Sequence, residues 1–114
     1  VEQQLSNLKI SKIIFFINHF TPAGAPGEVF FGTALSGDMM EYNLNGPGLM
    51  VQGGSYVASA PTVNMDIQWQ GFGKALFSGE SMFLIHLSGS GPVILNSFGA
   101  VYPIQVNGDY IVDT

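Results

Sequence analysis

An internal repeat limits the fold of this chain more than any other feature of its sequence. Residues 36–46 (SGDMMEYNLNG) overlay residues 98–108 (FGAVYPIQVNG) without a gap. Both stretches contain a glycine, an apolar pair, alternating polar and apolar residues and a final Asn-Gly. Self-similarity of this kind indicates two copies of one supersecondary unit. The alternation further predicts that the unit is made of β-strands.

Two shorter matches extend the repeat. His19 overlays His86, and Leu49–Val51 overlays Tyr110–Val112. The second copy stops at Thr114, one strand short of the first copy, and the chain begins without a methionine. We therefore expect a fragment or a processed product, with an open sheet edge that invites pairing with another strand.

Short β-forming runs separated by glycine and proline account for most of the chain. The clearest is Val63–Gln70, in which every second residue is apolar. The stretch 78–95 predicts a strand, a glycine turn and the start of another strand, and Asn45–Gly48 predicts a hairpin turn. The strands that we predict are 13–20, 28–35, 39–44, 49–52, 55–59, 63–70, 82–87, 93–98, 101–106 and 110–113.

Strands of this length between regularly spaced turns are typical of an all-β fold. We predict a double-stranded β-helix or β-sandwich roll made of two similar halves. Residues 1–12 are interpreted as a lead-in of uncertain origin, either frayed or forming one helical turn. Residues 13–114 form the single domain, whose halves 13–59 and 80–114 are joined by the strand 63–70.

The surface of this domain carries little charge. Charged residues make up 10% of the 114 residues and hydrophobic residues 46%, whereas ordinary soluble domains have about 25% charged residues. A weakly charged surface favours self-association. We therefore expect a homo-oligomer, and a small monomer coated with neutral polar residues is the alternative.

Several functional classes are disfavoured by composition. The net charge is −5 with three lysines and no arginine, so neither a phosphate backbone nor an anionic membrane surface is an expected partner. No run of 18 apolar residues predicts a membrane span. Without cysteine, the chain has no disulfides, thiolate metal sites or cysteine nucleophiles.

The two histidines, His19 and His86, hold matching positions in the repeat. Paired across a roll, they could ligate a metal as histidines do in cupins. Such sites also need a carboxylate and a third histidine close by, and the sequence has neither His-x-His nor a neighbouring glutamate. We predict instead that each imidazole lies on the polar face of its strand, and we predict no metal and no cofactor.

Other candidates for chemistry have simpler structural interpretations. Glu80 with Ser78 or Ser81 could pair an acid with a nucleophile, but Gly-Glu is typical of a turn. Asp109 and Asp113 could bind calcium but lack enough ligands, and Trp69 is expected to pack in the core. We predict no catalytic residues. The residues to which we assign a structural role are Gly79, Glu80, Gly99, Gly108, Asp109 and Asp113.

Several runs of the sequence, taken together and in order, resemble the altered-inheritance-of-mitochondria family. They are residues 52–59, 77–83, 89–91, 98–100 and 108–113. The resemblance extends over residues 15–114. It implies a β-roll similar to that of the tryptophan RNA-binding attenuation proteins, with two similar halves and a tendency to form homo-oligomers.

The resemblance also implies that this chain is the carboxyl-terminal part of a longer member. It implies a cytoplasmic location in bacteria or archaea and a mitochondrial one in eukaryotes. No catalytic residues are carried over from it. The Gly-Glu-Ser motif that precedes each phenylalanine strand in the family is present at Ser78–Ser81 and is missing at Ser11–Ile14.

We therefore expect a non-enzymatic, oligomeric scaffold or binding module. The alternative is a small-molecule sensor that holds its ligand between strands or subunits. A metal-dependent enzyme of the cupin type is the third and weakest hypothesis.

Overall fold

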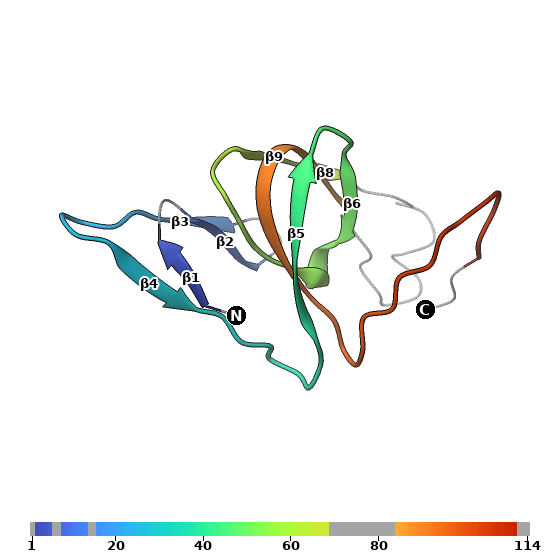
Figure 1. Ribbon diagram of the computed structural model, residues 1–114, viewed down its shortest axis with the longest axis horizontal. Helices are drawn as coiled ribbons and strands as arrows, with labels where there is room; N and C mark the ends of the chain where they lie inside the picture. The colour runs from blue at the N-terminus through green and yellow to red at the C-terminus, as the bar shows by residue number, and fades with distance from the viewer. Residues whose placement is uncertain (1, 6–7, 14–15, 69–83, 112–114) are drawn as a thin grey trace.

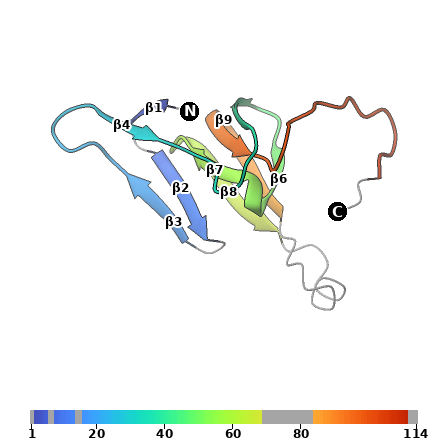
Figure 2. The same cartoon turned by 90° about the horizontal axis from the view of Figure 1, so that it is seen from below.

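The computed structural model describes residues 2–5, 8–13, 16–68 and 84–111, and these residues form an all-β fold (Figures 1 and 2). This confirms the predicted fold class, and the arrangement is compatible with a sandwich or a roll. One short 3-10 turn, η1 (Gly53–Ser55), interrupts the strands. The strands are β1 (Glu2–Leu5), β2 (Leu8–Ile13), β3 (Phe16–Phe20), β4 (Gly27–Phe30), β5 (Met39–Asn45), β6 (Leu49–Gln52), β7 (Tyr56–Ser59), β8 (Val63–Gln68) and β9 (Leu84–Asn96).

The long strand β9 organises the other strands. Its C-terminal half pairs with β5 and β7, and its N-terminal half pairs with β6 and β8, all antiparallel. The register runs from Met39 opposite Asn96 to Asn45 opposite Ser90, and β6 then follows from Leu87 onward. The chain therefore passes from β5 to β6 along β9, and from β7 to β8 in the same way.

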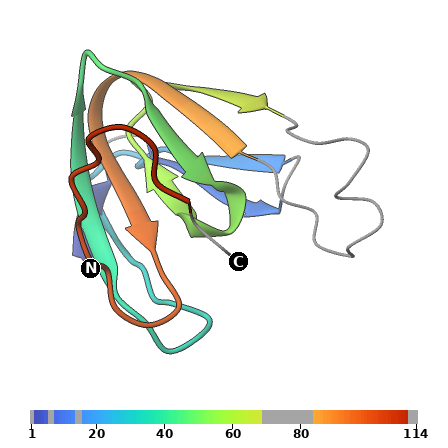
Figure 3. The ribbon, with the colours of Figure 1, turned by 90° about the vertical axis from the view of Figure 1, so that its right-hand side faces the viewer.

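β9 bends sharply at its centre, where Gly89 and Gly91 have φ angles of 96° and 136°. A Cβ at Gly91 would lie 2.8 Å from the Thr62 hydroxyl oxygen, so a larger residue fits there neither sterically nor conformationally. The sequence predicted a glycine turn between two strands within residues 78–95. The structure has instead a bend within the single strand β9, because pairing with β5 continues through Gly91. The strands that pair with β9 follow the same bend (Figure 3).

The predicted hairpin at Asn45–Gly48 is wrong in its pairing. The chain does reverse direction there, with Gly46 at a φ of 89° (Figure 1). However, β5 and β6 pair with the two halves of β9 and not with each other. The bend in β9 explains the difference, because it brings the two strands onto separate layers of one folded sheet.

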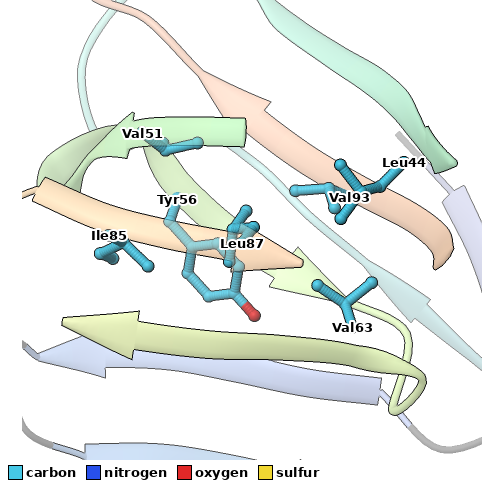
Figure 4. Packing of buried hydrophobic residues seen from close by; sticks show 7 residues of the cluster. All are labelled: Leu44, Val51, Tyr56, Val63, Ile85, Leu87 and Val93. Atoms are coloured by element: carbon cyan, nitrogen blue, oxygen red, sulfur yellow. The ribbon is translucent and has the colours of Figure 1, made fainter. Parts of the chain in front are cut away.

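The main hydrophobic core fills the space inside this fold (Figure 4). Val93 and Ile94 are neighbours in β9, and both are buried although their side chains lie on opposite faces. Ile94 belongs to a second, smaller cluster with Ala58, against which Val29 and Phe31 pack. The main cluster consists of Leu44, Val51, Tyr56, Val63, Ile85, Leu87 and Val93.

The strand predicted at Val63–Gln70 is confirmed through Gln68 and lies outside the described residues beyond it. Val63 is buried and Met65 and Ile67 are half-buried, whereas Asn64 and Asp66 are exposed. The alternation of apolar and polar residues therefore places one face of β8 on the core, as the sequence indicates.

The N-terminal region differs from the prediction. Residues 2–5 form β1 instead of a helical turn, and β1 pairs with β4. The return strand predicted over 28–35 is only Gly27–Phe30, and it does not pair with β3, which lies beside β2. β2 joins this region to the main sheet through Lys9, opposite Ser59 of β7. Because β1 pairs with β4, and β2 pairs with β3 and β7, the residues of the lead-in contribute to the fold.

The predicted strands at residues 101–106 and 110–113 are absent from the described part, which ends at Ile111, and β9 stops at Asn96 instead of Phe98. Residues 98–111 run as an extended segment along the outside of the molecule (Figure 3). The local sequence favours a strand, but no described strand lies beside this segment to accept its hydrogen bonds. The two copies of the predicted repeat therefore differ in their pairing within the described chain. β5 pairs with β9, whereas residues 98–111 pair with no strand.

Candidate functional site

The most unusual surface of the molecule is the segment of residues 98–111, which we call the C-terminal arm. Its large apolar side chains are exposed, and the exposed fraction reaches 93% at Ile111 and 81% at Tyr102. Large apolar residues that gather on a surface in this way mark an interaction site. The exposed apolar residues of the arm are Phe98, Val101, Tyr102, Ile104, Val106, Tyr110 and Ile111.

The base of the C-terminal arm is held in place by hydrogen bonds to the loop before β5. Gly37 and Gly99 form a parallel bridge, in which the Asp38 N–H donates to the Gly99 carbonyl oxygen at 2.9 Å. The Val101 N–H donates to Asp38 Oδ2 at 3.1 Å. A Cβ at Gly37 would overlap the carbonyl oxygen of Ser97. Glycine at position 37 therefore allows the arm to leave the body in a fixed direction.

A second exposed apolar surface lies on β3 and β4, which we call the N-terminal edge. Ile17 and Phe20 of β3 are 37% and 43% exposed, and Phe30 of β4 is 73% exposed. Within the described residues, β3 pairs only with β2 and β4 pairs only with β1. Each of these strands therefore has one free edge in the described part of the molecule.

The molecule as a whole is more open than a compact monomer of its size. Its radius of gyration is 15.2 Å, whereas a compact chain of this length has about 13 Å. Its accessible surface is 8154 Å², against about 6,100 Å² for a folded monomer of the same mass.

The two histidines are not brought together within one chain. His19 is exposed on β3, whereas His86 lies half-buried on β9, opposite both Met50 and Asp66. The strands β2 and β7 separate β3 from β9 in the sheet, a separation of about 14 Å or more. No group of three histidine, aspartate or glutamate side chains is close enough to hold a metal in the described residues.

The residues with a predicted structural role are only partly described. Gly99 and Gly108 have φ angles of 79° and 92°, which other residues rarely adopt, and Asp109 is exposed beside Gly108. Gly79, Glu80 and Asp113 lie outside the described residues, as do Ser78, Ser81 and Trp69.

A hollow of about 320 Å³ lies where the C-terminal arm leaves β9. The Asn96 side chain lines it and, oriented to satisfy its hydrogen bonds, donates to the carbonyl oxygens of Gly54 and Ser55 at 3.1 Å each. The sequence carries no signal for this hollow, because its residues come from three separate segments. They are Ala34, Leu35, Gln52, Gly54, Ser55, Asn96, Ser97 and Phe98.

One buried polar pair lies in the core rather than at either surface. The Tyr56 and Ser59 hydroxyl oxygens are 2.8 Å apart, and either can donate to the other. Burial raises the pKa of Tyr56 above its usual value, and the hydrogen bond from Ser59 offsets part of that increase. The pair satisfies two polar groups inside the core, which is a structural role.

Comparison with known protein families gives one match. Residues 3–114 match the family described as mitochondrial biogenesis AIM24. The chain belongs to the AIM24 family. This confirms the resemblance seen in the sequence. The match also includes most of residues 1–12, so the N-terminal strands of this AIM24 chain are family sequence.

No curated protein and no solved structure matches this AIM24 chain. In the described part of the chain, no helix is long and apolar enough to cross a bilayer. We therefore infer a function from the family assignment and from the exposed surfaces of the described residues.

Proposed function

We propose that this AIM24 chain is a non-enzymatic scaffold or binding module that acts as a homo-oligomer. The observation that carries the proposal is the exposed apolar surface on the C-terminal arm and the N-terminal edge. Ile111 and Phe30 illustrate it, with 93% and 73% of their side chains exposed. Such residues are stabilised when a partner removes them from water, by about 25 cal/mol for each Å² buried.

The amount of exposed surface supports an assembly with other copies of the chain. The chain exposes about 2,000 Å² more than a compact monomer of its mass, and a standard interface covers about 800 Å² on each partner. Low charge is consistent with burial of this surface, since only 10% of the residues are charged. In a bacterium or archaeon the module would work in the cytoplasm, and in a eukaryote in mitochondria.

The hollow beside Asn96 favours a second candidate function, a small-molecule sensor. Its volume of about 320 Å³ falls at the lower end of the range for small-molecule sites. Its lining combines apolar side chains, such as Leu35 and Phe98, with the amide groups of Gln52 and Asn96. A neutral molecule with hydrogen-bonding groups would suit this lining.

The mass of the native assembly tests the first proposal. Light scattering and native mass spectrometry of untagged protein should give one discrete oligomer at micromolar concentration. A monomer at all concentrations would contradict the scaffold proposal. A metabolite that raises the melting temperature, and loses this effect in an Asn96→Leu variant, would favour the sensor instead.

The enzyme hypothesis is tested separately. Stoichiometric metal in an elemental assay, lost in His19→Ala and His86→Ala variants, would favour it over the scaffold. We expect no metal in either variant, and no change in the oligomer in His86→Ala.

A further inference from the structure

We propose that the C-terminal arm of one copy adds strands to the N-terminal edge of a second copy. The inference rests on the proposed homo-oligomer and names the surfaces that form it. Residues 110–111 pair with residues 19–20 of the second copy. Two copies that exchange arms in this way form a closed, two-fold symmetric dimer.

The C-terminal arm has the properties of a strand that lacks a neighbour. Among the described residues, the backbone of 102–111 has no hydrogen-bond partner. Its apolar residues Ile104 and Val106 are about half exposed and lie on either side of the polar Gln105. Unpaired donors and acceptors beside apolar side chains favour addition to a sheet edge.

The N-terminal edge has matching properties. β3 and β4 each have a free edge within the described residues, and their exposed residues Ile17, Phe20 and Phe30 are apolar. A strand added there would bury apolar surface of both partners and supply hydrogen bonds along the backbone. Glu28 is the one charged residue of these two strands, so little charge has to be desolvated.

The internal repeat provides the register. In the first copy of the repeat, Leu49 lies opposite Leu87 and Met50 opposite His86. Tyr110 and Ile111 overlay Leu49 and Met50, as His19 overlays His86. Applying the same pairing to the second copy places Tyr110 opposite Phe20 and Ile111 opposite His19.

The arm and the N-terminal edge lie at opposite ends of the described chain, so the arm does not pair with the edge of its own copy. The longest dimension of the molecule is 48 Å, with β3 and β4 at one end and the arm at the other (Figures 1 and 2). The bridge between Gly37 and Gly99 and the bond from Val101 to Asp38 direct the arm away from its own N-terminal edge.

Engineered disulfides test both the register and the source of the partner strand, because the chain contains no cysteine. Residues directly opposite in adjacent strands have Cβ atoms about 4.5–5.5 Å apart, near the spacing a disulfide requires. Chains carrying only Phe20→Cys are mixed with chains carrying only Tyr110→Cys and oxidised mildly. We expect the two chains to become linked in high yield. The control replaces Tyr110→Cys with Tyr102→Cys and should link poorly. Tyr102 lies out of register and is more exposed than Tyr110, 81% against 57%, so poor linking there would not result from lower accessibility.

The outcomes separate this inference from the proposed function. A discrete oligomer without a link between residues 20 and 110 would overturn the strand exchange and leave the scaffold proposal standing. A monomer by light scattering would overturn both. A chain carrying both cysteines that closes on itself, and migrates as a monomer under denaturing conditions, would show that the arm pairs with its own N-terminal edge.

A charge substitution gives a second test that does not depend on disulfide geometry. Ile111→Lys should abolish the dimer at concentrations where the unmodified protein is fully assembled, while the far-ultraviolet circular dichroism of the subunit persists. Met50→Lys, at an exposed position of β6 away from both surfaces, should leave the dimer intact. Dimerisation that is unchanged in Ile111→Lys would contradict the proposal.

Discussion

β5 and the C-terminal arm have similar sequences and different structures. Residues 36–46 and 98–108 overlay without a gap, yet β5 pairs with β9 over seven residues and the arm pairs with no strand in the described chain. Leu44 in the first stretch is 2% exposed, whereas its counterpart Val106 is 51% exposed. The comparison teaches that an alternating pattern provides a strand's two faces, and that a neighbouring strand provides its stability.

The largest expected effect comes from shortening a core side chain of β9, the strand with which β5 pairs and the arm does not. Leu87→Ala in β9 should lower the free energy of unfolding by about 2–5 kcal/mol, because Leu87 is fully buried in the main core. Urea unfolding measures the change. Ile111→Ala, at a monomer-forming concentration, is the matched control and should change stability by less than about 0.5 kcal/mol. Equal losses in both variants would show that the arm packs within its own chain.

Two glycines, one in β9 and one in the arm, give the next largest expected effect. Gly91→Ala should destabilise the protein by about 2–3 kcal/mol, because the residue has a φ of 136° and a Cβ would contact Thr62. Gly108 has a φ of 92° and open space around it, so we expect Gly108→Ala to cost about 1 kcal/mol. Thermal unfolding of the two variants would contradict this reasoning if Gly108→Ala were the more harmful.

The polar pair in the core predicts a smaller effect. Tyr56→Phe should cost about 1–2 kcal/mol, because the buried Ser59 hydroxyl loses its bond to Tyr56. Tyr102→Phe on the exposed arm is the control and should have no measurable effect on the stability of the monomer. A Tyr56→Phe variant as stable as the unmodified protein would show that this hydrogen bond makes no net contribution.

The same residue predicts a dependence on pH. Burial raises the pKa of Tyr56 in the folded state, so the folded protein holds the phenol proton more tightly than the unfolded chain does. The contribution of this proton to the free energy of unfolding is complete below the unfolded pKa of about 10 and is lost as the pH rises through the folded pKa. Stability measured between pH 8 and pH 11 should fall above pH 10, and less steeply in Tyr56→Phe. Identical slopes in the two proteins would exclude Tyr56 as the cause.

The smallest effect is expected where the arm is attached. Asp38→Ala removes the acceptor of the Val101 N–H and should cost about 0.5–1.5 kcal/mol at most. Hydrogen exchange of the Val101 amide should accelerate, while exchange of the β9 amides stays unchanged. Slow exchange at Val101 in this variant would show that another group holds the base of the arm.

Much of the fold could be predicted from the sequence because alternation is a local property. The strand at residues 63–68 follows from residue order alone. Near Gly89 the sequence predicted a turn between two strands, and the structure has a bend within the single strand β9. The family resemblance, confirmed over residues 3–114, also came from short local runs. The pairing of β5 and β6 with β9, in place of a hairpin, could not be predicted, because hydrogen-bond partners lie far apart in the sequence.

The candidate surfaces were predicted less well. Low charge led us to expect self-association, but it did not indicate which residues are exposed. Phe20 and Tyr110 are large residues of types that often lie in a core, and only the structure shows that they are exposed. The hollow at Asn96 brings together residues from three segments and had no signal at all.

The sequence by itself determined that this protein is all-β, which residues alternate between the two faces of each strand, and where glycine bends the chain. Those properties depend on the conformational preferences of single residues and their immediate neighbours. The tertiary structure alone decided which strands pair, which apolar residues are buried, and which of two similar stretches lacks a neighbour. Hydrogen bonding between strands and the burial of side chains depend on residues that are distant along the chain, so they are settled only when the whole chain folds.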